Sequence, residues 1–329
     1  MIKQNERNNS IYTFFNILKE KIIFYIDHFR NKNRKIKLFI FIIFLIICIC
    51  LFLYKLFFID LKEIKVCLCA IGKRENLYVR EYVEHYKLYG VNKIFIYDNN
   101  EIDGEVFDNI LSDYISNEFV EIINYRGKKQ VQLQMLNDCY NRNYEKYDWF
   151  IMFDMDEFIY LKNHINIKTY LKRIEFRKYE VIYFFRACHT DNNHLHYENK
   201  SLFERFPQSV YNVLSVKPIL RGHYFNITID NIHIINWNIK YCYSFGEKKV
   251  KKMDFKNYFI DHFYYKSTEE FINKINRGDA YFNDSYGLRK GKIGEYLVIN
   301  NMTLEKINYI EKETKINLTD FRQKLINNQ

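Results

Sequence analysis

Proline and glycine are scarce in this sequence, with two prolines and ten glycines among 329 residues. No Pro- or Gly-rich linker divides the chain after residue 62 and no internal repeat is visible, so we expect one continuous domain there. Its length allows a core that needs no disulfide bonds. The cysteines form no CxxC pair and no even framework, so they do not define a redox compartment. We interpret Cys67 and Cys69 as small apolar residues of the core.

Charge is absent from one long stretch, Leu38–Tyr54, which holds 17 residues without a charged side chain. Residues 56–59 continue its apolar character after Lys55, whose ammonium group can reach a membrane interface from near a helix end. A spanning helix needs about 20 apolar residues, and no small-x-small cleavage site follows this stretch. We therefore predict a transmembrane anchor over residues 38–59 rather than a cleaved signal peptide.

The net charge of +10 is concentrated before this anchor. Residues 1–37 carry nine Lys or Arg and three acidic residues, a net +6 that leaves +4 for the rest of the chain. Positive flanks stay in the cytosol, so a cytosolic basic tail over 1–37 and single-pass type II topology are predicted, in a Golgi or other secretory membrane if the host is eukaryotic. Nucleic acid is not an expected partner, because the basic excess lies beside the membrane. Residues 11–29 have helical spacing and fit either a helix on the membrane face or a loosely ordered tail.

Strand and helix signals alternate through the first half of the remaining chain. Apolar runs predict strands over 64–70, 93–97, 120–125 and 149–153, and helical spacing recurs over 75–88, 106–114 and 130–143. Weaker signals predict strands over 181–186 and 215–220 and helices over 271–277 and 304–325. Repeated strand–helix units predict an α/β domain over 62–329, with a mostly parallel twisted sheet flanked by helices. Ligands of such sheets bind beyond the carboxyl ends of the strands.

Two carboxylates follow the fourth predicted strand, in the triplet Asp154-Met155-Asp156. Residues i and i+2 of an extended segment share one side, so both acids can offer oxygens to one Mn²⁺ or Mg²⁺ ion. Such an ion can neutralise a diphosphate leaving group. Phosphohydrolases carry a similar triplet, but theirs follows a first strand and usually continues with a small residue and then Thr or Val. Here Glu157-Phe158 follows, which disfavours that class.

The motifs Cys69–Asn76, Tyr97–Asn100 and Phe153–Phe158 follow one another at spacings that are more specific together than any one motif. In their order and spacing the chain resembles glycosyltransferase family 92 and the related GT-A-fold, family 2-like glycosyltransferases. The resemblance covers about residues 64–280, and later segments such as Ser215–Arg221 and His262–Ser267 look similar too. It implies a GT-A-like fold and a hexosyltransferase that uses a nucleotide-sugar, often UDP-galactose-like, with inversion at the anomeric carbon. The acceptor would be a hydroxyl of a glycan, glycoprotein or glycolipid.

The resemblance also implies site residues by position. Lys73, Glu75 and Asn76 would lie beside the nucleotide. Asp98 would hold the base or the ribose. Relatives commonly have Asn directly before the Glu of this turn, whereas Arg74 stands there in this chain, which affects the role assigned to Asn76.

The metal would be Mn²⁺ or Mg²⁺ on Asp154 and Asp156. His262 is either its third ligand or a half-buried histidine before a Tyr-rich turn. Inversion needs a general base for the acceptor hydroxyl, for which Asp191 and Glu157 are both candidates.

Two further residues and two rival functions stay open. Lys217 and Arg221 either contact phosphate or flank an edge strand. A sugar-phosphate transferase would use the same metal and diphosphate site. A non-catalytic, membrane-anchored scaffold that binds nucleotide or glycan would keep the fold without metal dependence.

Overall fold

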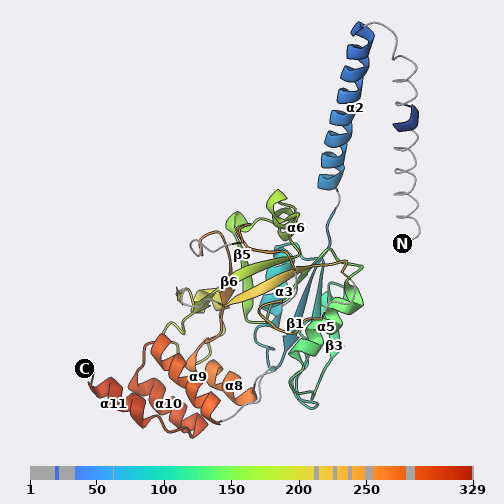
Figure 1. Ribbon diagram of the computed structural model, residues 1–329. Helices are drawn as coiled ribbons and strands as arrows, with labels where there is room; N and C mark the ends of the chain where they lie inside the picture. Colours follow the sequence, from blue (N-terminus) through green and yellow to red (C-terminus); the bar gives the residue numbers. More distant parts are fainter. Residues whose placement is uncertain are drawn as a thin grey trace. The chain divides into compact units, whose positions relative to one another are not determined.

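The computed structural model describes residues 19–21, 34–61, 63–210, 215–224, 228–235, 239–248, 255–278 and 286–327. The chain divides into two compact units, residues 1–63 and 64–329 (Figure 1). In the first unit, helix α2 spans Arg34–Leu61. No helix within the described residues meets the length and apolarity that a membrane crossing needs. The anchor over 38–59 stays a prediction, and the predicted helix over 11–29 lies outside the described residues apart from 19–21.

The second unit is built on one mixed sheet with the strand order β3-β2-β1-β4-β8-β6-β10-β5, while β7 and β9 also pair with β6. Five of the nine strand pairs in the described residues are parallel. An α/β fold is therefore confirmed, but the sheet is less parallel than predicted. The strands are β1 (Val66–Gly72), β2 (Lys93–Asp98), β3 (Val120–Asn124), β4 (Trp149–Ile151), β5 (Glu157–Leu161), β6 (Val181–His189), β7 (Ser209–Val210), β8 (Val216–Arg221), β9 (Tyr241–Tyr243) and β10 (Tyr258–His262).

The antiparallel pairs are those of β8 with β4 and β6, of β7 with β6 and of β5 with β10. Between β6 and β8 the described residues form the four-residue helix α7 (Leu202–Arg205) and the two-residue strand β7, and β8 runs back beside β6 as antiparallel neighbours do. The described helices of this unit are α3 (Val79–Leu88), α4 (Ser112–Ser116), α5 (Gln132–Asn143), α6 (Ile167–Leu171), α7 (Leu202–Arg205), α8 (Thr268–Arg277), α9 (Tyr286–Ile299), α10 (Leu304–Thr314) and α11 (Thr319–Asn327), with short 3-10 turns at Lys162–His164 and Ile174–Phe176.

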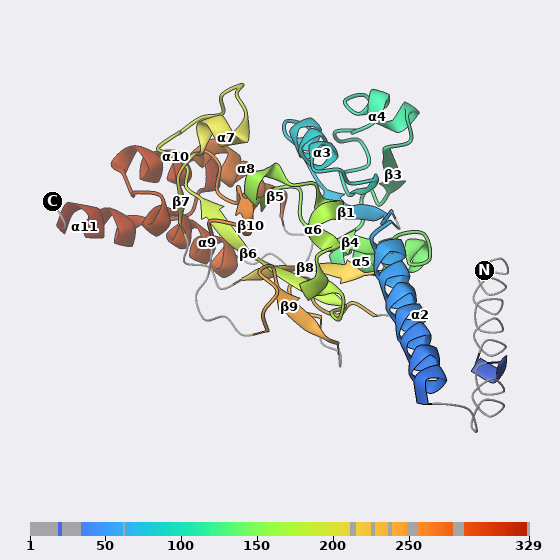
Figure 2. The same cartoon turned by 90° about the horizontal axis from the view of Figure 1, so that it is seen from above.

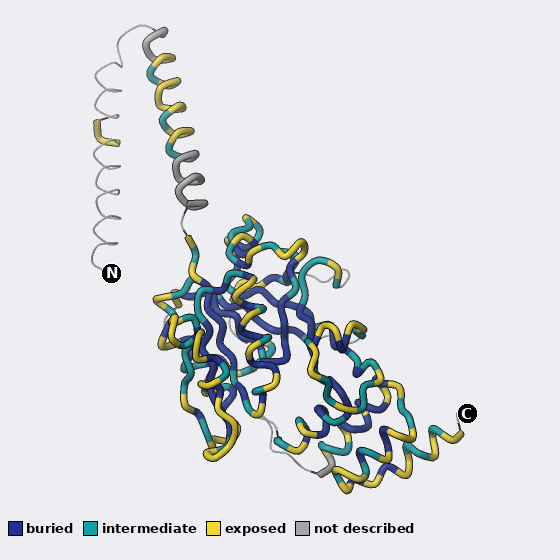
Figure 3. The backbone as a smooth tube through the Cα atoms, turned by 180° about the vertical axis from the view of Figure 1, so that it is seen from behind, coloured by how far each residue is buried: buried dark blue, intermediate teal, exposed yellow. Residues whose placement is uncertain are grey.

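Alternation along β1 divides the core between the two faces of the sheet. Val66, Leu68 and Ala70 pack with α3, while Cys67 and Cys69 pack with α5 on the other face. A third apolar cluster joins α8, α9 and α10, which gather beside β6 and β10 in Figure 2. Figure 3 shows the sheet as the most deeply buried part of this unit. Helices α3 and α5 thus pack on opposite faces of the sheet, and residues of α8 and α9 line the site described below.

One disulfide bond ties β1 to α5. It joins Cys69 to Cys139 across 70 positions of sequence, with their Cα atoms 6.3 Å apart. The interpretation of Cys69 as a free core thiol was therefore wrong. It holds for Cys67, which is buried and unpaired. Sequence could not identify the bond, because the two cysteines belong to no recognisable spacing pattern.

Removing this disulfide is expected to lower the free energy of unfolding by about 4 kcal/mol, because a cross-link over so long a loop restricts the unfolded chain. Urea unfolding of the full chain with Cys69→Ala and Cys139→Ala together would measure the loss. Dithiothreitol should destabilise the natural protein and leave the double variant unchanged. An equal response of the two proteins to dithiothreitol would show that the bond does not form.

Candidate active site

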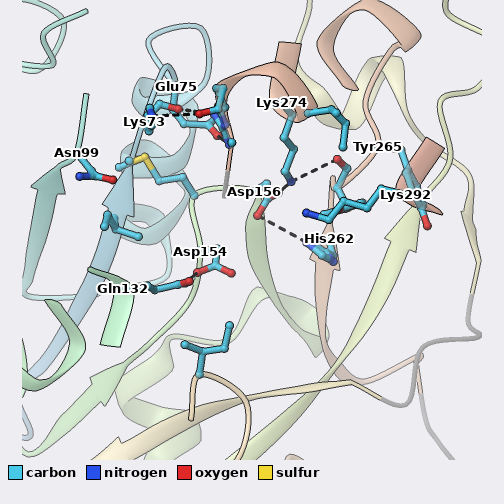
Figure 4. A pocket seen from close by; sticks show the side chains of 18 of the residues that line it. Lys73, Glu75, Asn99, Gln132, Asp154, Asp156, His262, Tyr265, Lys274 and Lys292 are labelled. Carbon is cyan, nitrogen blue, oxygen red and sulfur yellow. Dashed lines mark hydrogen bonds and ion pairs between the residues drawn. The ribbon is translucent and has the colours of Figure 1, made fainter. Parts of the chain in front are cut away.

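A cleft of about 390 Å³ opens at the carboxyl ends of β1 and β4. Its walls include the turn after β1, the turn between β4 and β5, and residues of β6, β10, α8 and α9. Figure 4 shows Asp154 beside Gln132, and Asp156 with Lys274, His262 and Tyr265 near it. The cleft thus lies at the sheet edge where the strand–helix pattern predicts a ligand.

Asp154 lies at the start of the turn between β4 and β5, with its side chain 31% exposed. Its Oδ1 accepts a hydrogen bond from Gln132 Nε2 at 2.7 Å, and its Oδ2 lies 2.6 Å from Lys217 Nζ. Burial alone would raise the pKa of this carboxyl, but the Lys217 ammonium group holds it below its usual value. Asp154 is therefore an anion at neutral pH, and one lysine already balances part of its charge.

Asp156 is more deeply buried, with a side chain 7% exposed. Lys274 Nζ donates to its Oδ2, and His262 Nε2 lies 3.6 Å from its Oδ1. Burial would raise its pKa, but Lys274 first and His262 second keep the pKa well below the usual aspartate range. This carboxylate keeps its negative charge inside the cleft at every pH at which the protein is expected to work.

His262 sits at the end of β10 and faces the cleft. Burial, reinforced by the charge of Arg186, lowers its pKa to about 4. The imidazole is therefore neutral at pH 7, which is the form that binds metal ions. Its Nδ1 lies 3.4 Å from Cys188 Sγ, so Nε2 is the nitrogen that faces Asp156.

The donor set fits a divalent ion in part. Two ligands held about 2.1 Å from one Mg²⁺ ion lie roughly 3 to 4 Å apart, so the 3.6 Å between Asp156 Oδ1 and His262 Nε2 suits a shared ion. Asp154 lines the same cleft but turns toward Lys217 and Gln132. Within the described ranges, no three His, Cys, Asp or Glu side chains converge as a closed metal site. Asp156 and His262 are thus the residues best placed to hold an ion, with Asp154 beside them.

Neither predicted general base reaches the cleft. Glu157 is fully buried, accepts from the Asp154 backbone N–H at 2.9 Å and pairs with Arg186 at 3.0 Å, so it supports the turn that carries the two aspartates. Asp191 is 1% exposed, and its Oδ2 lies 2.7 Å from Lys306 Nζ. It does not line the cleft. Both acids are buried because a cation compensates each of them, which a sequence motif does not reveal.

The four residues predicted for the nucleotide separate into two pairs. Lys73 and Glu75 line the cleft, whereas Asn76 and Asp98 do not. The Asp98 carboxylate instead lies 2.7 Å from Arg126 and anchors the loop after β2, and its neighbour Asn99 takes the place at the cleft wall.

Glu75, which was predicted to lie beside the nucleotide, also forms ion pairs with two cations. Its carboxylate lies 2.6 Å from Arg277 and 3.3 Å from Lys266. Burial would raise its pKa, but these two cations lower it. Arg277 also donates to the carbonyl of Lys73, so α8 is fastened to the turn after β1.

Lys217 and Arg221, the two further cations named from the sequence, lie in different places. Lys217 is buried and contacts Asp154 and Glu157, so it acts at the site through those acids. Arg221 lies elsewhere, with its guanidinium 4.2 Å from the ring centroid of Trp149. Sequence reasoning assigned no role to four other cleft residues: Asn99, Gln132, Arg186 and Glu295. A lone arginine inside an apolar strand was a usable signal for Arg186, whereas Glu295 lies on a helix that was not predicted.

Comparison with known proteins identifies the family of this chain. The family model for glycosyltransferase family 92 matches residues 62–313, so the chain belongs to this family. Family 92 proteins of Arabidopsis thaliana and Ricinus communis are 30% and 25% identical over 106 and 111 residues. These matches span 30% and 34% of this chain but only 17% and 20% of the relatives.

Solved structures give a weaker likeness. Crystal structures of S. aureus TarS, one of residues 1–349 in complex with UDP, match 71% of this chain at 10% identity. The matched share of those chains is 43% and 70%, with TM-scores of 0.38 and 0.33. Likenesses of this size do not define a shared site.

Proposed function

We propose that this chain is a metal-dependent glycosyltransferase with a GT-A-like domain. It moves a hexose, galactose-like, from a nucleotide-sugar to a hydroxyl of a glycan acceptor, with inversion at the anomeric carbon. The observation that carries this proposal is the cleft at the strand ends, where the anionic Asp156 and the neutral His262 face each other at 3.6 Å. Membership of family 92 supports the reaction class.

The chemistry divides among the residues of the cleft. A bound Mn²⁺ or Mg²⁺ ion would neutralise charge on the leaving diphosphate, and Asp156, His262 and Asp154 would hold it. Lys73 and Lys274 line the same cleft and add positive charge beside the diphosphate. Glu157 and Lys217 hold the turn of the two aspartates in place. A UDP-sugar donor is proposed on the strength of the family resemblance.

The general base of an inverting transfer is assigned to Glu295. Among the residues that the structure describes, four acids line the cleft: Glu75, Asp154, Asp156 and Glu295. The first three pair with lysine or arginine, whereas Glu295 accepts a hydrogen bond from the neutral Tyr265 hydroxyl at 3.0 Å. A base must reach the acceptor and take up a proton, which is easiest for a carboxylate that no cation neutralises.

We also propose that the domain faces the lumen of a secretory compartment, on a type II anchor over residues 38–59. The disulfide between Cys69 and Cys139 supports this placement, because such bonds persist in oxidising compartments and are rare in the cytosol. The cationic tail over 1–37 supports the orientation.

The proposed function is tested by incubating the full chain with Mn²⁺, a panel of nucleotide-sugars and mixed glycan acceptors, and following nucleotide release. One donor is expected to be consumed, and only when a divalent ion is present. Chelation with EDTA should abolish turnover, and added Mn²⁺ should restore it. If no donor is consumed, and nucleotides bind equally well with and without metal, the scaffold interpretation replaces this one.

A further inference from the structure

A second cavity, of about 340 Å³, adjoins the cleft described above. The two share four wall residues, Glu75, Tyr264, Lys274 and Arg277. The ion pair of Arg277 with Glu75, at 2.6 Å, forms part of the partition between them. The two cavities are therefore neighbours that share one wall.

Aromatic and polar groups alternate on the wall of this second cavity. Tyr78, Tyr197 and Tyr264 line it, and both Tyr197 and Tyr264 are half-buried. Arg205 lies 5.0 Å from the Tyr197 ring centroid and Lys274 lies 3.9 Å from that of Tyr264, so each ring has one face against a cation. Glu269 and Asn273 of α8 line it as well, with the Glu269 side chain 37% exposed. Apolar ring faces beside a few hydrogen-bonding groups are typical of small-molecule sites. A sugar ring offers the matching surface, with C–H faces for the rings and hydroxyls for the carboxylate and amide.

The charges of the cavity favour a neutral ligand over an anion. Each cation on its wall already contacts a carboxylate: Arg74 pairs with Glu101, Lys266 and Arg277 with Glu75, and Lys274 with Asp156. The Lys266 ammonium group also lies 3.5 Å from the ring centroid of Tyr78. An anionic ligand would have to displace one of these buried or partly buried pairs, which is costly.

We propose that the second cavity binds a neutral sugar ring of the acceptor glycan and presents its hydroxyl to the donor cleft. The inference rests on the proposed transferase function and names the substrate class of the neighbouring subsite. Neutral hexoses fit because each cation on the wall already contacts a carboxylate, and the wall supplies aromatic residues, the Glu269 carboxylate and the Asn273 amide. Shared walls place the acceptor beside the donor, which is the arrangement that direct transfer needs.

A blocking substitution tests the cavity without altering the donor cleft. Asn273→Trp would fill the cavity from α8, and Asn276→Trp is its matched control, since Asn276 is exposed on the same helix and lines neither cavity. With the full chain, Asn273→Trp is expected to raise the acceptor KM at least tenfold and to leave acceptor-free hydrolysis of the donor unchanged. The Asn276→Trp protein should behave as the natural one. Equal acceptor KM values for all three proteins would overturn the proposal.

Direct binding separates this proposal from the function on which it rests. Saturation-transfer NMR with p-nitrophenyl glycosides of neutral hexoses should show binding to the natural protein and to Asn276→Trp but not to Asn273→Trp. That result would support the site even if no donor were consumed, in which case only the transferase proposal fails. Binding restricted to acidic sugars such as glucuronides, or binding unaffected by Asn273→Trp, would show that the cavity is not a neutral-sugar site.

Discussion

Replacing Asp156 by Asn is expected to lower the rate of sugar transfer about 10³-fold, because the loss of a charged metal ligand removes several kcal/mol of transition-state stabilisation. The amide keeps the volume of the side chain but cannot balance Lys274 or a divalent ion. We expect the affinity for Mn²⁺ to fall together with the rate. Titration of nucleotide release against Mn²⁺ would measure both effects in one experiment.

The control for this variant is Asp320→Asn, which makes the same chemical change at a side chain that is 77% exposed. It should retain full activity. Since Asp156→Asn also leaves Lys274 without its carboxylate partner, thermal unfolding must show that the variant is folded. A folded Asp156→Asn protein with more than a tenth of the natural rate and an unchanged Mn²⁺ dependence would remove Asp156 from the metal site.

The parallel half of the sheet could be predicted because its strands are unbroken apolar runs between polar turns. Strands β5 and β10 were not predicted. Strand β5 is a run of four apolar residues after Glu157, directly behind the Asp154-Met155-Asp156 triplet, and the apolar run of β10 is only three residues long before Asp261 and His262. Asp261 and His262 are buried in β10 only because tertiary partners meet them; His189 lies 2.8 Å from Asp261. Local sequence does not contain such partners.

The bounds of the C-terminal helices were also not predicted correctly from the sequence. A single helix was predicted over 304–325, but the structure ends α10 at Thr314 with Lys315 in the left-handed region, at φ 59°. A residue in the left-handed conformation usually ends a helix. Glycine or asparagine at position 315 would have indicated this helix end in the sequence. Helix α9 was not predicted at all, so neither was the acid that it carries into the cleft.

Position along the chain identified part of the candidate site. The two aspartates and Lys73 were found because polar residues at the carboxyl ends of parallel strands meet at one edge. Asp98 fits the same rule, and Asp191 was a candidate base by its order along the chain, but ion pairs with Arg126 and Lys306 hold them in structural roles. Sequence motifs place acids near a site, whereas their cation partners decide which acids remain available for chemistry.

The second large loss of transfer rate is expected at Glu295, whose side-chain partner among the described residues is the Tyr265 hydroxyl rather than a lysine or arginine. In the proposed step the acceptor oxygen bonds to the anomeric carbon as the bond from that carbon to the diphosphate oxygen breaks. The electron pair leaves with the diphosphate, and the hydroxyl proton passes to Glu295. Glu295→Gln should lower transfer by about 10² to 10⁴-fold, the usual contribution of a general base. Donor affinity, measured by calorimetry, should stay unchanged because the glutamine can still accept from Tyr265.

Chemical rescue separates catalysis by Glu295 from a structural role. Sodium formate should restore part of the transfer rate to Glu295→Ala, since a small carboxylate can occupy the vacated space and take up the proton. It should not help Asp156→Asn, whose defect lies in the ion site. Glu305→Gln, an exposed acid on α10, is the matched control and should be silent. If Glu295→Gln transfers sugar at the natural rate, or if formate fails to rescue a folded Glu295→Ala protein, the base must be an acid outside this cleft or water.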